Sequence, residues 1–233
     1  MIVDRMHHRL LRLLSHHGVC LACIINVAIS STPLSADTIT FQDGFNGYTG
    51  TMDTYVKDDA RADDNLGTDA TISADRDVGL DSVGLLSFEI FGNGTNRIPL
   101  GTSILSATLQ LQVGSVSGAD ATLHRMLVTW DENTTTYNSM TTSGPGIQFD
   151  DFEARIVPDA VLPSQALDIM SVDVTDAVVY WSAGNSNFGW SILPGNSTLG
   201  VAFRSSESND FHPQLLVEIP TAVPEPQRFP YWG

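Results

Sequence analysis

The residues best suited to chemistry are the aspartates that crowd into one short, polar stretch. Residues 57–69 hold five aspartates together with Arg61 and the turn sequence Asn65-Leu66-Gly67. Clustered carboxylates supply the oxygen ligands that calcium prefers, although the ligand order of an EF-hand is absent. The alternative is a solvated run of surface charge. We expect calcium as a cofactor here, with these candidate ligands: Asp58, Asp59, Asp63 and Asp64.

Two tyrosines near this stretch are the candidates for ligand binding. Tyr48 ends a turn-rich segment, and Tyr55 lies two residues before Lys57. Flat rings in solvent-facing loops can stack on sugar faces, and a nearby cation can hold an acidic sugar. We therefore predict a binding surface made of Tyr48, Tyr55, Lys57 and Arg61. Exposed tyrosines without a ligand are the alternative.

A second concentration of chemical groups is Thr129–Asn138, which reads Thr-Trp-Asp-Glu-Asn-Thr-Thr-Thr-Tyr-Asn. Trp130 could be a platform for sugars or part of the core. A tryptophan at the end of an amphipathic strand buries a large apolar area while its N–H finds a nearby partner, which favours the core. Glu132 is then expected to accept hydrogen bonds from amides of its own turn or to pair with Arg125.

Motifs of the common catalytic classes are missing. Both cysteines and four of the six histidines lie before residue 37, and the remaining His124 and His212 have no metal-ligand spacing. No Gly-x-Ser-x-Gly elbow or phosphate-binding loop is present. Paired carboxylates for glycoside hydrolysis stay possible, because 27 acidic residues always allow some pair. We predict a non-enzymatic protein, with a polysaccharide-degrading enzyme as an alternative.

Residues 1–36 have the sequence of a secretory signal peptide. Three arginines form a basic head, residues 19–29 form an apolar run, and Leu34-Ser35-Ala36 offers a cleavage site. The run is too short to span a bilayer, so no membrane span is expected in the mature chain. A short N-terminal anchor that stays attached is the alternative.

The charge of the chain restricts its partners. The formal net charge is −16, and the predicted leader removes three arginines but only one acid. Nucleic acids and anionic membrane surfaces are polyanions, so both are excluded as expected partners. Solubility outside the cell is the simplest reason for the charge. Without cysteines the mature chain must rely on a hydrophobic core, which its length allows as one domain.

Period-two alternation of apolar residues predicts about ten strands. The clearest is Ser106–Gly114, in which a slip of one residue would turn the whole apolar set to water. Ala121–Thr129 is expected to be its antiparallel neighbour. The predicted strands are Ile39–Gln42, Thr54–Val56, Thr71–Ala74, Val83–Phe91, Ser106–Gly114, Ala121–Thr129, Met170–Val174, Phe188–Leu193, Gly200–Arg204 and Gln214–Ile219.

One helix and one long loop complete the prediction. Thr175 is expected to cap a helix through Ala183 that places Trp181 in the core, and Gly184 ends it. Residues 139–165 are expected to form a functional or mobile loop. The fold class is all-β: an antiparallel β-sandwich of jelly-roll type with one short helix, over residues 37–220. The proline-rich residues 221–233 are expected to be a disordered tail.

Short motifs run in order along most of the predicted sandwich. They are Leu85-Leu86-Ser87-Phe88, the segment 104–111, Leu123-His124-Arg125-Met126, Trp130-Asp131-Glu132, Thr136-Tyr137-Asn138 and His212-Pro213-Gln214-Leu215. Together they resemble the DNRLRE, or disaggregatase-related, β-sandwich domains. Tyr137 and His212 depart from the family's usual Trp and Arg. The tail sequence Val223-Pro224-Glu225-Pro226 resembles the start of a PEP-CTERM sorting signal, but the apolar span and basic cluster that should follow it are missing.

The resemblance implies a secreted, non-catalytic domain of bacteria or archaea, often attached to polysaccharide-degrading enzymes and in some members a carbohydrate-binding module. We therefore expect a bacterial protein, secreted or in the cell envelope, that binds a polysaccharide or cell-envelope glycan. A structural protein of the envelope or extracellular matrix without glycan binding is the alternative.

Overall fold

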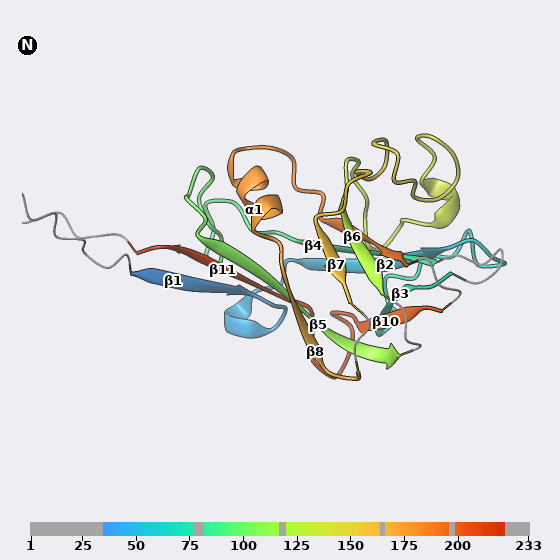
Figure 1. Cartoon of the computed structure of the whole chain (residues 1–233), viewed down its shortest axis with the longest axis horizontal. Coiled ribbons are helices and arrows are strands. Elements are labelled where there is room, and N and C mark those ends of the chain that lie inside the picture. Colours follow the sequence, from blue (N-terminus) through green and yellow to red (C-terminus); the bar gives the residue numbers. More distant parts are fainter. Residues whose placement is uncertain (1–34, 77–81, 117–119, 164–165, 196–198, 222–233) are drawn as a thin grey trace, which may run out of the picture. The chain divides into compact units, whose positions relative to one another are not determined.

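The computed structural model describes residues 35–76, 82–116, 120–163, 166–195 and 199–221. The predicted leader and tail lie almost wholly outside these residues. Within them the chain forms strands and one α-helix (Figure 1): β1 (Ala36–Phe41), β2 (Thr51–Lys57), β3 (Thr71–Ala74), β4 (Ser82–Phe88), β5 (Ser106–Val116), β6 (Ala121–Arg125), β7 (Ala160–Leu162), β8 (Ile169–Asp173), α1 (Thr175–Ser182), β9 (Trp190–Pro194), β10 (Val201–Arg204) and β11 (Gln214–Pro220).

The strands form two antiparallel sheets packed as a sandwich, which confirms the predicted fold class. One sheet has the order β1-β11-β5-β10-β3, with β8 also paired to β5, and the other has the order β2-β4-β9-β6-β7. The neighbours β1-β11-β5-β8 and β4-β9-β6-β7 give the jelly-roll order, in which the chain passes repeatedly from one sheet to the other.

The expected pairing of β5 with its successor β6 is wrong. Strand β5 is paired with β11, β10 and β8, whereas β6 lies in the other sheet between β9 and β7. The clean alternation of β5 fixed which face is buried. It contained no information about which strand would be hydrogen-bonded beside it, because pairing is decided by the crossovers of the jelly roll.

The sandwich holds two hydrophobic clusters, one on each face of the sheet that contains β4. Leu86 and Phe88 point into the main core between the sheets, whereas Val83 and Leu85 point outward into a second cluster. Residues from the connection between β6 and β7 cover that outer face, with Met140 and Ile147 packed on it. Strand β4 is therefore buried on both faces.

The connection between β6 and β7, residues 126–159, is a packed cover whose backbone is held by an acid. Glu153 is fully buried and accepts hydrogen bonds from the backbone N–H of Ser143 at 2.7 Å and from its hydroxyl at 2.8 Å. A buried carboxylate with such donors ties two ends of an irregular segment together. The sequence predicted a loop here but missed the short strand β7.

Within the described residues the tryptophans occupy the core, as predicted for Trp130 and Trp181. Trp130 is buried, and its indole N–H donates to the carbonyl of Phe188 at 2.8 Å. Trp181 and Trp190 pack against each other with ring centroids 4.6 Å apart. Gly184, with φ of +93°, ends α1 as expected, but Thr175 does not cap it.

Among the described residues, no helix combines the length and the apolar character that crossing a membrane requires.

Candidate functional site

Tyr48 and Tyr55, the predicted stacking residues, are both buried, so the expectation of exposed rings is wrong. Tyr48 is 1% exposed, because its turn-rich segment folds back and sets the ring edge-on against Phe41 and under the Arg97 guanidinium. Burial raises the pKa of the Tyr48 hydroxyl. Tyr55 lies within β2 and donates its hydroxyl to Asp69 at 2.7 Å. Neither ring can offer a face to a ligand.

The two predicted cations are engaged by the acidic stretch itself. The ammonium of Lys57 lies 3.0 Å from Asp59, and the guanidinium of Arg61 lies 3.2 Å from Asp64 and 3.9 Å from Asp69. These ion pairs are partly exposed, so they order the loop more than they stabilise the fold.

The four predicted metal ligands do not come together. Asp59 also accepts the backbone N–H of Arg61, and this bond together with Lys57 lowers its pKa. Asp63 accepts the side-chain amide of Asn138 at 2.8 Å. Because Asp59, Asp63 and Asp64 each already have a partner, the stretch is a surface loop that neutralises part of its own charge.

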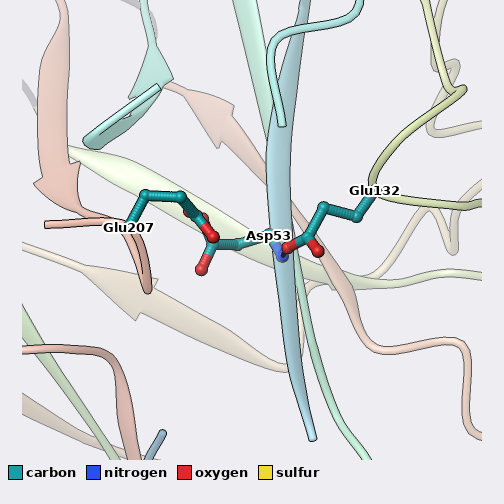
Figure 2. A group of neighbouring side chains, drawn as sticks. All are labelled: Asp53, Glu132 and Glu207. Carbon is teal, nitrogen blue, oxygen red and sulfur yellow. Dashed lines mark hydrogen bonds between the residues drawn. The ribbon is translucent and has the colours of Figure 1, made fainter. Parts of the chain in front are cut away.

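The acids that do converge are Asp53, Glu132 and Glu207, here called the acidic group. In the described parts of the chain, these are the carboxylates whose oxygens lie within 4.8 Å of one another (Figure 2). Asp53 belongs to β2, Glu132 to the turn that follows Trp130, and Glu207 to the connection between β10 and β11. Three segments distant in sequence therefore meet through their carboxylates.

Backbone contacts fix the acidic group in place. The N–H of Asp53 donates to Glu132 at 2.8 Å, and the N–H of Ser206 donates to Asp53 at 2.8 Å. Asn65 donates its amide to the carbonyl of Glu132 at 2.7 Å, and Gly67 packs so closely that a Cβ there would lie 2.1 Å from that carbonyl oxygen. The aspartate-rich stretch, residues 57–69, thus packs onto the turn that contains Glu132. The Glu132 carboxylate thus accepts its hydrogen bond from Asp53 in the distant strand β2. Neither expected alternative, an amide of its own turn or Arg125, is its partner.

Electrostatics make the acidic group hard to ionise fully. Burial raises the pKa of Asp53 well above its ordinary value, and the negative charge of Glu207 raises it further. Burial also raises the pKa of Glu132, with a contribution from Glu207. Carboxylates gathered in this way can share a proton, or they can supply oxygen ligands to a hard divalent cation.

A second site, here called the aromatic pocket, lies over the outer face of β4 and β9. It has a volume of about 250 Å³, and it combines two rings, hydrogen-bonding side chains of several kinds and an apolar floor. The described residues that line it are Asp58, Arg76, Val83, Tyr137, Ile147, Gln148, Phe149, Leu193 and Pro194.

The covering segment positions both rings of the aromatic pocket. Tyr137 begins a short 3-10 helix, Tyr137–Ser139, whose start is closed by a reciprocal capping box between Thr136 and Ser139. The backbone of Gly146, with φ of +82°, lies against the Tyr137 ring, where a Cβ would come within 2.3 Å. Phe149 is 43% exposed, and its ring lies 5.7 Å from that of His124.

The aromatic pocket can bind a small polar molecule with apolar faces. Rings give flat contact area, while Asp58, Arg76 and Gln148 offer acceptors and donors. The sequence interpretation singled out Asp58 and Tyr137 for other reasons and missed Phe149. Phe149 could have been found, because it is an aromatic residue close to the turn sequence Gly144-Pro145-Gly146, just as Tyr48 was chosen as an aromatic residue in a turn-rich segment. No sequence feature pointed to Arg76.

Comparison with known proteins agrees with this geometry. The model of carbohydrate-binding module family 96 matches residues 45–219, about three quarters of the chain, and this range contains the acidic group and the aromatic pocket. No curated protein matches the chain. The family match, the β-sandwich and the exposed ring beside polar side chains lead to one conclusion: the chain belongs to carbohydrate-binding module family 96.

Proposed function

We propose that the aromatic pocket is the glycan site and that its ligand is a segment of polysaccharide. One observation carries the assignment: Phe149 is exposed and Tyr137 half-buried, and both border a pocket that also presents carboxylate, guanidinium and amide groups. A sugar ring has an apolar face that stacks on an aromatic ring and hydroxyls that need hydrogen-bond partners at its rim. The pocket supplies both kinds of contact.

The pocket favours binding without catalysis. Glycoside hydrolysis commonly needs two carboxyl groups that flank the scissile bond. Asp58 is the one carboxylate among the described residues that line the pocket. The acidic group lies elsewhere and takes no part in that lining. We therefore propose a binding module and expect no release of reducing sugar from any bound polysaccharide.

Affinity electrophoresis followed by titration calorimetry tests the glycan site, with neutral and acidic polysaccharides as probes. We expect Phe149→Ala and Tyr137→Ala to weaken binding about tenfold, a loss typical of one aromatic contact. Phe152→Ala is the matched control, because Phe152 is exposed on the same segment but does not line the pocket. Equal losses in all three variants would contradict the assignment. Binding to no glycan would favour a structural protein.

We also propose calcium as a structural ligand of the acidic group, in place of the predicted aspartate loop. Its support is that Asp53 is 1% exposed and the charges acting on it are the negative charges of Glu207 and Glu132. Calcium at this position would connect the three segments. Added calcium should then raise the melting temperature in chelator-treated protein. An unchanged transition would contradict the proposal.

The cellular location stays a proposal from the leader sequence. We propose that the protein is exported by a bacterium and acts outside the cytoplasm, where polysaccharides are accessible. The likeness to disaggregatase-related domains and to a sorting signal is likewise a proposal from the sequence. Fractionation of cells that express the full chain tests this proposal, and retention in the cytoplasm would contradict it.

A further inference from the structure

Helix α1 carries a tyrosine that the proposed glycan site does not use. Tyr180 is 43% exposed, although the neighbouring Trp181 is buried in the core. An exposed ring on a helix usually moves between rotamers. This one is held by a group beneath it.

The group beneath Tyr180 is the guanidinium of Arg125, whose carbon lies 4.3 Å from the ring centroid. The side chain of Arg125 is 6% exposed, so the cation acts on the ring in a largely water-free setting, where such contacts are strongest. Arg125 is fixed in turn by Asp159, which takes two of its N–H groups at 2.8 and 3.2 Å. Asp159 also accepts the indole N–H of Trp190 at 3.0 Å. The ring thus rests on a guanidinium that is itself held in place by hydrogen bonds.

A polar hollow lies beside this support. It has a volume of about 270 Å³ and is lined by Asp159, Asp173, Val174, Thr175, Asp176 and Ala177. Asp176 lies four residues before Tyr180 on α1, so the two side chains are neighbours on one helix face. Hydrogen bonds from the Thr175 hydroxyl and N–H lower the pKa of Asp173. The exposed carboxylate of Asp176 therefore stands next to the exposed ring, and that of Asp173 lines the same hollow as Asp176.

We propose that Tyr180 and this hollow form a second sugar-binding site, specific for neutral sugars. The ring would stack on the apolar face of one sugar unit, and Asp173 and Asp176 would accept hydrogen bonds from its hydroxyls. Because both acids are exposed and negatively charged, the site disfavours uronate or sulfate groups. The inference rests on the proposed carbohydrate binding but concerns a different surface, whose described lining shares no residue with the aromatic pocket.

Titration of the folded protein with a neutral and an acidic oligosaccharide tests the second site, using calorimetry and NMR shifts. Phe149→Ala provides a background in which the aromatic pocket is weakened. In that background we expect Tyr180→Ala to reduce neutral-sugar affinity by about five- to tenfold, and Tyr180→Phe to restore it. Asp176→Asn should also weaken the neutral ligand. Val179→Ala, at an exposed position of the same helix, is the control and should change nothing.

The outcomes separate this inference from the proposed glycan site. If Tyr180→Ala leaves neutral-sugar affinity unchanged while Phe149→Ala abolishes it, the second site is wrong and the first stands. If wild-type protein binds no sugar, both are wrong. A fall in melting temperature of Tyr180→Ala without any change in sugar affinity would show that the ring serves only to cover Arg125.

Discussion

Two buried aspartates at different places in the sandwich show how the same side chain can be accommodated in opposite ways. Asp159 has a side chain 4% exposed and is surrounded by donors: Arg125 at 2.8 Å, Arg155 at 3.2 Å and the indole of Trp190 at 3.0 Å. Asp53 is just as buried, but the charged groups near it are the acids Glu132 and Glu207. The fold supplies the counter-charge for Asp159 and not for Asp53.

Asp159 is therefore a structural residue, whereas Asp53 needs a proton or a cation from the solvent to compensate its charge. An ionised carboxylate is costly to bury unless a cation or several donors compensate it. At Asp159 compensation comes from the chain, so this aspartate contributes to the fold under most conditions. At Asp53 it must come from a proton or an external cation. Stability at the acidic group should therefore respond to pH and calcium, whereas stability at Asp159 should not respond to calcium.

Loss of the Asp159 carboxylate gives the largest expected effect. Asp159→Asn leaves the Arg125 guanidinium buried without its counter-ion, and we expect the free energy of unfolding to fall by about 3–5 kcal/mol. Urea unfolding of the wild type and the variant measures this loss of free energy. Arg155→Met is the control, since the Arg155 side chain is 37% exposed and should cost at most about 1 kcal/mol. A loss of similar size in both variants would show that Arg125 is not the critical partner.

The same substitution at the other aspartate should have the opposite sign. Asp53→Asn keeps an acceptor for the Ser206 N–H and removes one of three gathered negative charges. In chelator at pH 8 we expect a higher melting temperature than wild type, with the free energy of unfolding raised by about 0.5–3 kcal/mol, the size typical of single substitutions. Asp37→Asn, at an exposed acid of β1 outside the acidic group, controls for the change in net charge. A lower melting temperature for Asp53→Asn would contradict the comparison.

The pH dependence follows from the raised pKa values of Asp53 and Glu132. A group whose pKa is raised by folding binds its proton more tightly in the folded state. Its contribution is fully present below the ordinary carboxyl pKa of about 4 and is lost as pH rises through the folded-state pKa. Unfolding in chelator should show stability falling as the pH rises above the ordinary carboxyl pKa of about 4. The slope should be smaller in Asp53→Asn; equal slopes would exclude the acidic group as its source.

The smallest expected effect distinguishes the acidic group from the aspartate loop. Calcium should raise the melting temperature of wild type and of Asp63→Asn alike, because Asp63 is exposed and bonded to Asn138. It should have no effect on Asp53→Asn. Differential scanning calorimetry with and without chelator measures both responses. A calcium response that disappears in Asp63→Asn and persists in Asp53→Asn would restore the loop as the metal site.

The alternation of the sequence located the described strands other than β7, but it did not show which strands pair with each other. The alternation in Ser106–Gly114 located β5 and its buried face, and the Trp130 segment was placed in the core correctly. Strand pairing could not be predicted, because β5 and β6 enter different sheets although they are adjacent in sequence. Burial of β4 on both faces depended on a cover that comes from residues far along the chain.

The candidate sites were the least predictable features, for the same reason. Asp53, Glu132 and Glu207 are separated by whole strands in sequence and meet only in the folded chain. The dense aspartate loop offered the stronger local signal, yet Lys57, Arg61 and Asn138 bind three of its carboxylates, those of Asp59, Asp64 and Asp63. Tyr48 looked exposed because turn-rich sequence usually lies on the surface. Local composition therefore predicted a metal site in the aspartate loop. The carboxylates that do converge could be found only once the folded structure was known.

The central claim is that the aromatic pocket binds glycan. Its most direct test is calorimetric titration of wild-type and Phe149→Ala protein with one polysaccharide that the wild type retains in affinity electrophoresis, at fixed pH and calcium. We predict saturable binding by wild type, about tenfold weaker binding by the variant and unchanged melting temperatures. Identical affinities for the two proteins would contradict the account.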